Sequence, residues 1–172
     1  LVLIATTFHK TAIIFLPVYF LSNKKLTHKY LIIFLIVILM TFIFKLQIFN
    51  IITKLVYGNY AAIQNGGGYK LLLLLIIIFV GSLYILYKKN NKEEQEQNNI
   101  WLNMLLIGIL VQTLASIEGN IARLTMYFEY SIIFLIPNII EEIDDKKIRI
   151  FLKCIVYILL TVYFVISIQN ST

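Results

Sequence analysis

The stretch Leu71–Tyr87, LLLLLIIIFVGSLYILY, decides the fold class, because it contains no charged residue and no proline. An apolar helix of about 20 residues is long enough to cross the hydrocarbon core of a bilayer. The stretch Leu1–Leu21 is also apolar but is interrupted by His9 and Lys10. The sequence therefore predicts an all-α, polytopic transmembrane bundle of about five to six spans. Four further stretches are similar to Leu71–Tyr87 in length and are predominantly apolar: Tyr30–Phe49, Trp101–Ile117, Ile121–Ile140 and Ile150–Ile168.

The overall composition also indicates a membrane protein. Hydrophobic residues make up 60% of the chain and charged residues 14%, against about 45–50% and 25% in soluble domains. Lipid cannot satisfy exposed backbone polar groups, so the spans are expected to be helices. The chain begins with Leu1, inside an apolar run. We interpret residues 1–172 as a single transmembrane domain, the C-terminal portion of a longer membrane protein.

The distribution of basic residues predicts the orientation. Nine of the 15 lysines and arginines lie in three links, residues 22–29, 88–99 and 141–149. The positive-inside bias puts these links in the cytoplasm and the links at 50–70 and 118–122 outside. The link 88–99, KKNNKEEQEQNN, is interpreted as a solvated linker. The net charge of +6 is assigned to topology, and no nucleic-acid partner is expected, because no basic face with stacking residues is found.

Ionisable residues near membrane depth are costly and therefore mark candidate functional sites. The first such place is the segment Thr6–Thr11, which holds His9 and Lys10 ahead of the next apolar run. A histidine can act as acid or base near neutral pH, and Lys10 offers a cation to a phosphate. The alternative is an interfacial histidine beside a lysine that extends its amine to the headgroup level.

The second place is the segment EGNIAR, residues 118–123. Asn120 is predicted to cap the N-terminus of a helix, which puts Arg123 in the first turn. A guanidinium beside free backbone N–H groups suits a diphosphate, because both donate hydrogen bonds to phosphate oxygens. The alternative is a structural ion pair between Arg123 and Glu118.

Two residues farther along the same predicted helix extend this group. Helical spacing puts Tyr127 on the same side as Arg123. Glu129 lies deeper in the span, and a partner such as Lys45 or His9 is expected for it. Structural pairing and service as a general base both remain open for Glu129.

The last place is the predicted outer link between Asn50 and Lys70. Its first part, residues 51–57, is expected to form an amphipathic helix in the membrane interface, and the triple glycine 66–68 is expected to form a turn. Aromatic anchoring at the headgroup level and sugar binding are both open here. The residues Tyr57, Tyr60 and Gln64 would suit a sugar-facing surface, and Lys54 is a further substrate-binding candidate. No metal-ligand spacing is found anywhere in the chain, and no cofactor is expected.

Three short motifs follow one another along the chain: FHKTAIIFLP at Phe8–Pro17, the glycines at 66–68, and ARLTMYF at Ala122–Phe128. Together they resemble the C-terminal half of the EpsG-type, Wzy-like exopolysaccharide polymerases. The resemblance implies a multi-pass enzyme of the bacterial inner (cytoplasmic) membrane with its active side outside the cytoplasm. Its substrate would be an undecaprenyl-diphosphate-linked oligosaccharide, transferred as growing glycan onto the next lipid-linked repeat unit. Other exopolysaccharide assembly proteins would be its partners.

The charged residues identified above would supply the groups that such a reaction needs. Arg123, with Lys10, would stabilise the departing diphosphate, and His9 or Glu129 would accept the proton of the acceptor hydroxyl. Tyr127 and the outer link would orient sugar and lipid. The catalytic candidates are therefore His9, Arg123 and Glu129, and the substrate-binding candidates are Lys10, Lys54, Tyr57, Gln64, Glu118, Asn120 and Tyr127.

Two alternatives to a polymerase stay open. A transporter or flippase of lipid-linked saccharide would bind the same diphosphate, but it would need charged residues along a cavity in the cytoplasmic half, which is almost wholly apolar in sequence. A non-catalytic membrane subunit of an exopolysaccharide assembly system would tolerate changes of His9, Arg123 and Glu129 together.

Overall fold

The structure, a computed structural model, describes residues 2, 4, 6, 10–21, 24–57, 68–89 and 92–169. Its elements within these residues are all helical, which confirms the predicted fold class. In chain order they are the 3-10 helix η1 (Lys10–Phe15) and the α-helices α2 (Leu16–Leu21), α3 (His28–Ile43), α4 (Lys45–Tyr57), α5 (Tyr69–Lys89), α6 (Lys92–Ala115), α7 (Gly119–Glu141) and α8 (Lys146–Gln169).

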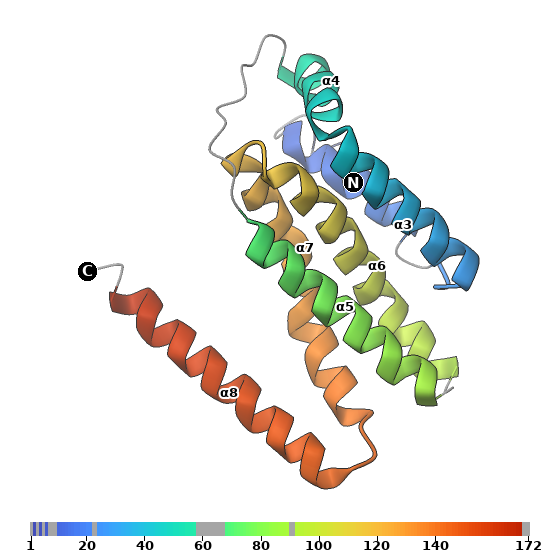
Figure 1. The fold of residues 1–172 in the computed structure, drawn as a ribbon, viewed down its shortest axis with the longest axis vertical. Helices are drawn as coiled ribbons and strands as arrows, with labels where there is room; N and C mark the ends of the chain where they lie inside the picture. Colours follow the sequence, from blue (N-terminus) through green and yellow to red (C-terminus); the bar gives the residue numbers. More distant parts are fainter. Residues whose placement is uncertain are drawn as a thin grey trace.

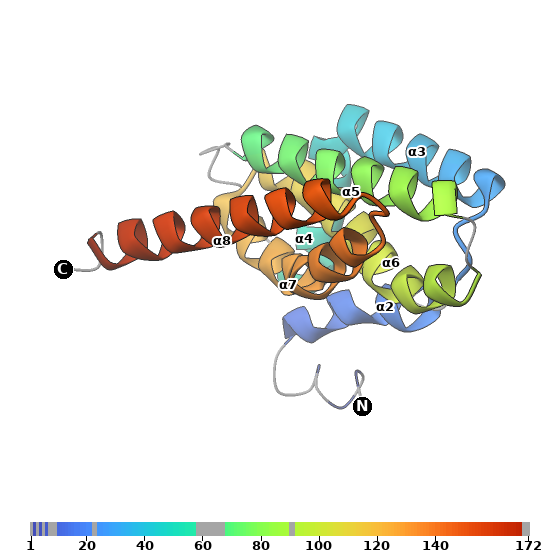
Figure 2. The ribbon, with the colours of Figure 1, turned by 90° about the horizontal axis from the view of Figure 1, so that it is seen from below.

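Helix α6 is the centre of the bundle (Figures 1 and 2). It packs most extensively against α7, and α5, α3 and α2 cover its other sides. Because α6 has neighbours on several sides, it buries both apolar and polar side chains. Its buried apolar residues are Leu102, Leu105, Leu106, Ile107, Ile109 and Val111.

The number of membrane-crossing helices is only partly settled by length and composition. In the part of the chain that the structure describes, two segments are long and apolar enough to cross a membrane, Tyr69–Lys88 and Asn98–Ala115. A third is present if α3 and the first residues of α4 count as one bent span. The expectation of about five to six spans stays a prediction.

The predicted span Tyr30–Phe49 is not one continuous helix, because α3 ends at Ile43 and α4 leaves it at an angle of 84°. The N–H of Phe44 still donates to Met40 O (2.9 Å), and Lys45 is the first residue of α4. A lysine in mid-span would be expensive in lipid, and the bend instead brings Lys45 against hydroxyl groups of other elements. The expected interfacial helix at 51–57 is confirmed as a helix, but it begins earlier, at Lys45.

The interpretation of residues 88–99 as a solvated linker is also wrong. Helix α6 begins at Lys92, and both Asn98 and Asn99 are buried. Asn138 of α7 donates to Asn98 Oδ1 (3.1 Å), so the amides hold α6 and α7 together at this end. The run of Lys, Glu and Gln before them favours helix by its intrinsic propensity.

Helix α8 is the least integrated helix, and it diverges from the bundle beyond its first turns (Figures 1 and 2). The connection from α7 is fixed by Arg149, whose guanidinium donates twice to Ile143 O (3.0 and 2.7 Å). Lys153 forms an ion pair with Glu141. These contacts set where α8 starts, and α7 is the main helix that it contacts.

Helices α6 and α7 approach each other closely at Gly108. A Cβ placed there would lie 2.9 Å from the Cβ of Phe128, which is shorter than side chains tolerate. Gly81 of α5, in contrast, has no atom within 4 Å of such a Cβ. The absence of a side chain at Gly108 therefore permits the main helix–helix contact of the bundle.

We predict that Gly108→Ala destabilises the protein, whereas Gly81→Ala does not. The overpacking at Gly108 is expected to cost ~1–3 kcal/mol, while alanine at Gly81 gains helix propensity without a clash. Thermal unfolding of both purified variants in one detergent measures the difference. Equal midpoints for the two variants would contradict the tight contact between α6 and α7.

Candidate functional site

The bundle has two ends, and we name each after a lysine. At the Lys45 end, α3 and α6 end while α5 and α7 begin; at the Lys25 end, α3 and α6 begin while α5 and α7 end. The Lys45 end corresponds to the predicted outer side. All the candidate site residues that the structure describes belong to the elements that meet near this end.

Helix α7 presents Arg123 and Tyr127 together on an exposed face, as the spacing predicted. Tyr130 continues this face one turn farther. The opposite face, with Thr125 and Phe128, is completely buried. Because the two faces are so different, the register of α7 fixes the direction in which the guanidinium points.

The start of α7 differs from the prediction. The helix begins at Gly119, so Asn120 lies inside the first turn and is not the N-cap. Glu118 precedes the helix and is buried, and its carbonyl accepts the N–H of Ile121 (3.0 Å). Arg123 consequently lies just beyond the first turn, still close to the positive end of the helix dipole.

The first and third motifs contact each other through aromatic rings. The ring of Phe15, the last residue of η1, meets Tyr127 edge-on at 5.6 Å and Phe128 at 5.8 Å between ring centroids. Phe15 is five residues after Lys10, and Tyr127 is four residues after Arg123. Segments more than a hundred residues apart are thus packed together, as a shared site requires.

Glu129 has an unusual environment for a carboxylate. The side chain is half-buried, and its Oε1 atom is buried without a hydrogen-bond partner within the described structure. The expected pairing with Lys45 is wrong, because Lys45 contacts other groups. The second expected partner, His9, lies outside the described residues. Glu129 therefore has one buried acceptor atom that no group of the described residues satisfies.

Lys45 is the residue whose importance the sequence did not reveal. Its Nζ donates to Tyr69 OH (3.0 Å) and Ser116 Oγ (3.1 Å), and it lies over the rings of Phe42 and Tyr69. A single contact group thus joins the α3–α4 break, the start of α5 and the turn after α6. The available clue was a lysine inside the apolar run 30–49.

The outer link is tied to the bundle beside this group. Gly68 has a positive φ of 98°, a conformation that glycine adopts without strain, and its carbonyl accepts Gln112 Nε2 (3.1 Å). A Cβ at Gly68 would lie 2.5 Å from that nitrogen. The last glycine of the triplet is therefore an anchoring point, whereas residues 66 and 67 lie outside the described residues.

The remaining candidates are less informative. Lys10 is the first residue of η1 and Tyr57 is the last of α4, and the structure describes only their backbone. Lys54 is exposed in the last turn of α4. Gln64 lies outside the described residues. Among those that are described, no group of three or more His, Cys, Asp or Glu residues could hold a metal ion.

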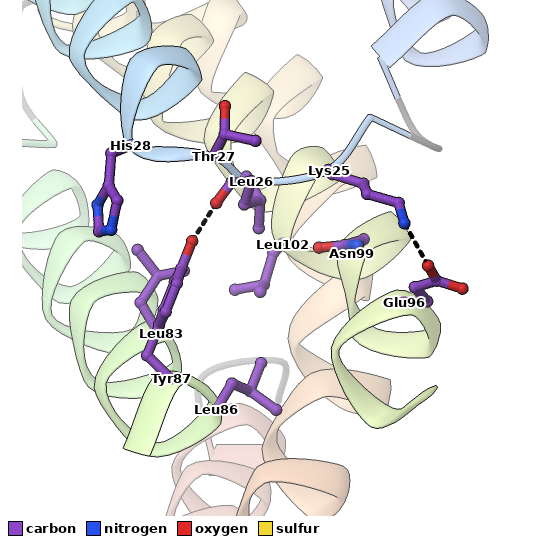
Figure 3. Close-up of a pocket in the computed structure, with 10 residues that line it drawn as sticks. All are labelled: Lys25, Leu26, Thr27, His28, Leu83, Leu86, Tyr87, Glu96, Asn99 and Leu102. Atoms are coloured by element: carbon purple, nitrogen blue, oxygen red, sulfur yellow. Dashed lines mark hydrogen bonds and ion pairs between the residues drawn. The ribbon is translucent and has the colours of Figure 1, made fainter. Parts of the chain in front are cut away.

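A cavity lies at the other end of the molecule. It has a volume of about 360 Å³ and is lined by residues of the 25–28 segment, α5 and α6 (Figure 3). None of the predicted site residues lines it. The half predicted to be cytoplasmic is also less apolar than expected, since Asn98, Asn99 and Asn103 are buried there.

Comparison with known proteins identifies one relationship. The model of the EpsG family matches the chain over residues 1–172. No curated protein and no solved structure matches it.

We predict that cysteines at Phe15 and Tyr127 can be cross-linked in membranes, in a Cys154→Ser background that removes the native thiol. A thiol reagent of short reach should join them, because the two rings are in contact. Mass spectrometry of the cross-linked peptides provides the readout. The control pair, Phe15→Cys with Tyr84→Cys, should fail, because α5 lies across α6 and α7 from α2 (Figure 2); equal yields would refute the juxtaposition.

Proposed function

The chain belongs to the EpsG family, and on this basis we propose that it is a polysaccharide polymerase of the bacterial cytoplasmic membrane. The observation that carries the proposal is the contact of Phe15 with Tyr127 and Phe128. It brings η1, which begins at Lys10, against the helix that carries Arg123 and Glu129; His9 directly precedes η1 in the sequence. Two cations, an imidazole and a carboxylate would then share one site on the extracytoplasmic side.

The proposed reaction is the transfer of a growing glycan from its undecaprenyl diphosphate to a sugar hydroxyl of the next lipid-linked unit. The bond between the anomeric carbon and the diphosphate oxygen breaks, and the acceptor oxygen forms the new bond to that carbon. The acceptor proton passes to Glu129 or His9. The lipid diphosphate leaves with both electrons of the broken bond, stabilised by Arg123 and Lys10.

The exposed face of α7 supports a binding role next to the chemistry. The planar guanidinium of Arg123 can donate two parallel hydrogen bonds to a diphosphate, whereas a lysine ammonium acts only as a point charge. Tyr127 and Tyr130 continue from it along the helix, and rings of this type combine an apolar body with a polar hydroxyl. In the proposal these two tyrosines contact the lipid chain. The sugar is contacted by Glu118, Asn120 and the outer link with Lys54, Tyr57 and Gln64.

The polar groups at the Lys25 end, the half predicted to be cytoplasmic, do not favour a transporter. Lys25 and Glu96, the charged residues of the cavity there, pair with each other at its rim. Further polar groups at this end are the buried asparagines. They are uncharged, and Asn103 bonds to the chain itself, accepting from Tyr30 OH (3.0 Å) and donating to Lys24 O (2.8 Å). Asn98 likewise accepts from Asn138. Groups that are satisfied internally stabilise packing and give no path for an anion.

We predict that Arg123→Ala reduces polymer synthesis by about 100-fold or more without lowering the amount of protein in the membrane. The reason is the loss of the proposed diphosphate contact at an exposed position. Polymer length and yield from purified lipid-linked repeat units measure the effect. Arg123→Lys should retain a small part of the polymer yield. Lys146→Ala removes an exposed cation elsewhere and should give the same polymer yield as the unchanged protein. Near-normal polymer from Arg123→Ala would remove Arg123 from the chemistry.

We predict separately that Glu129→Gln abolishes most activity while the protein remains folded. Glutamine keeps the shape but cannot accept the proton, and loss of a general base costs about 10²–10⁴-fold in rate. Glu141→Gln on the same helix is the matched control, since Glu141 is exposed and pairs with Lys153. The assay is the same polymer synthesis, accompanied by thermal unfolding. Full activity of Glu129→Gln would assign the carboxylate a structural role.

A further inference from the structure

The cavity at the Lys25 end lies where three candidate spans end together (Figure 3). His28 begins α3, Tyr87 is in the last turn of α5, and Asn99 lies at the start of the apolar part of α6. Residues at the ends of spans are at the depth of lipid headgroups. The cavity is therefore placed at a membrane interface and is independent of the site at the other end.

The lining of the cavity changes from apolar to charged. Leu26, Leu83, Leu86 and Leu102 form its apolar part. The ring of His28 stacks on that of Tyr87, with 5.8 Å between centroids, and makes a flat wall. Lys25 and Glu96 stand at the rim and form an ion pair of 2.5 Å (Figure 3).

Further lysines lie next to the lining residues in the sequence. Lys24 and Lys29 flank the lining segment in sequence, Lys88 follows Tyr87, and all three side chains are exposed. Among the residues that line the cavity, Glu96 is the only acid, and Lys25 already compensates it. The hydrogen bond from Lys25 and its charge lower the pKa of the Glu96 carboxyl, which favours its charged form. The rim thus favours an anion.

The wall of the cavity is fixed by hydrogen bonds to the 24–28 segment. The hydroxyl of Tyr87 donates to Leu26 O, and the fully buried Asn103 donates to Lys24 O. Thr27 caps α3 by accepting the N–H of Tyr30 (3.3 Å). A ligand therefore does not need to order this segment, which lowers the entropic cost of binding.

We propose that this cavity is a binding site for an anionic phospholipid, with the lipid phosphate on the lysines of the rim and the first part of the lipid tail against the leucines. Basic pockets between transmembrane helices on the cytoplasmic side suit anionic headgroups in this way. A cavity of about 360 Å³ holds a headgroup and the adjoining carbons and leaves the rest of the tails in the bilayer.

Glu96 competes with the lipid for Lys25. Both side chains of this pair are exposed, and ion pairs in water are weak because solvent screens them. A phosphate that is partly withdrawn from water can therefore replace the carboxylate as the partner of Lys25. The ion pair then acts as a competitor of the bound lipid, and removal of its acidic member should strengthen lipid binding.

The experiment uses the complete chain in a mild detergent, mixed with dioleoyl-phosphatidylglycerol, dioleoyl-phosphatidylcholine or glycerol 3-phosphate. Native mass spectrometry counts the molecules retained by each variant. Lys25→Ala should reduce retained phosphatidylglycerol about fivefold, and Glu96→Gln should increase it. Leu83→Trp, which fills the apolar part and keeps every lysine, should also reduce it. Phosphatidylcholine should be retained weakly by all of them.

Controls separate this site from general surface charge. Lys147→Ala and Glu141→Gln change exposed charges outside the cavity and should leave phosphatidylglycerol retention unchanged. An equal loss with Lys147→Ala, or a decrease with Glu96→Gln, would overturn the site. Retention of glycerol 3-phosphate equal to that of the lipid, unaffected by Leu83→Trp, would assign the cavity to a soluble phosphate ester and overturn the lipid proposal. Thermal unfolding confirms that each variant is folded.

Discussion

The close contact between α6 and α7 is the constraint on which the rest of the structure depends. It exists because Gly108 has no side chain and Phe128 occupies the space that is left. Phe128 also receives the ring of Phe15, so one buried residue holds the central helix and the first motif together. Any rotation of α7 would move Arg123 and Glu129 as well, because both are on the same rigid helix.

The apolar runs predicted most of the helices, because hydrocarbon burial requires length and composition that a sequence displays directly. Leu71–Tyr87 lies within α5 almost end to end. The break at Phe44 could not be predicted in this way, since neither proline nor glycine marks it. Its cause is tertiary, because Lys45 finds hydroxyl partners on α5 and beyond α6. The helical start of α6 was not predicted for a similar reason. The buried asparagines Asn98 and Asn103 of α6 form hydrogen bonds with residues of other helices.

The site was predictable where it depends on one helix and unpredictable where it depends on several. Helical periodicity correctly placed Arg123 and Tyr127 on a common face. The meeting of Phe15 with Tyr127 follows from packing between distant segments, and only the order of motifs hinted at it. Lys45 was expected to pair with Glu129, yet its hydrogen bonds go to hydroxyl groups of Tyr69 and Ser116. Spacing in sequence carries no information about such contacts.

The hydrogen bonding of two polar groups, the amide of Asn103 and the carboxylate of Glu129, indicates which of them takes part in the proposed reaction. Asn103 is fully buried in α6, and both ends of its amide are hydrogen-bonded, so it strengthens the fold. Glu129 Oε1 is buried without a partner within the described residues, and an acceptor in that state costs about 1–3 kcal/mol of stability. The unsatisfied acceptor does not stabilise the fold. In the proposed reaction, the same carboxylate can accept a proton. That difference is why Glu129, and not the asparagine, belongs in the proposed reaction.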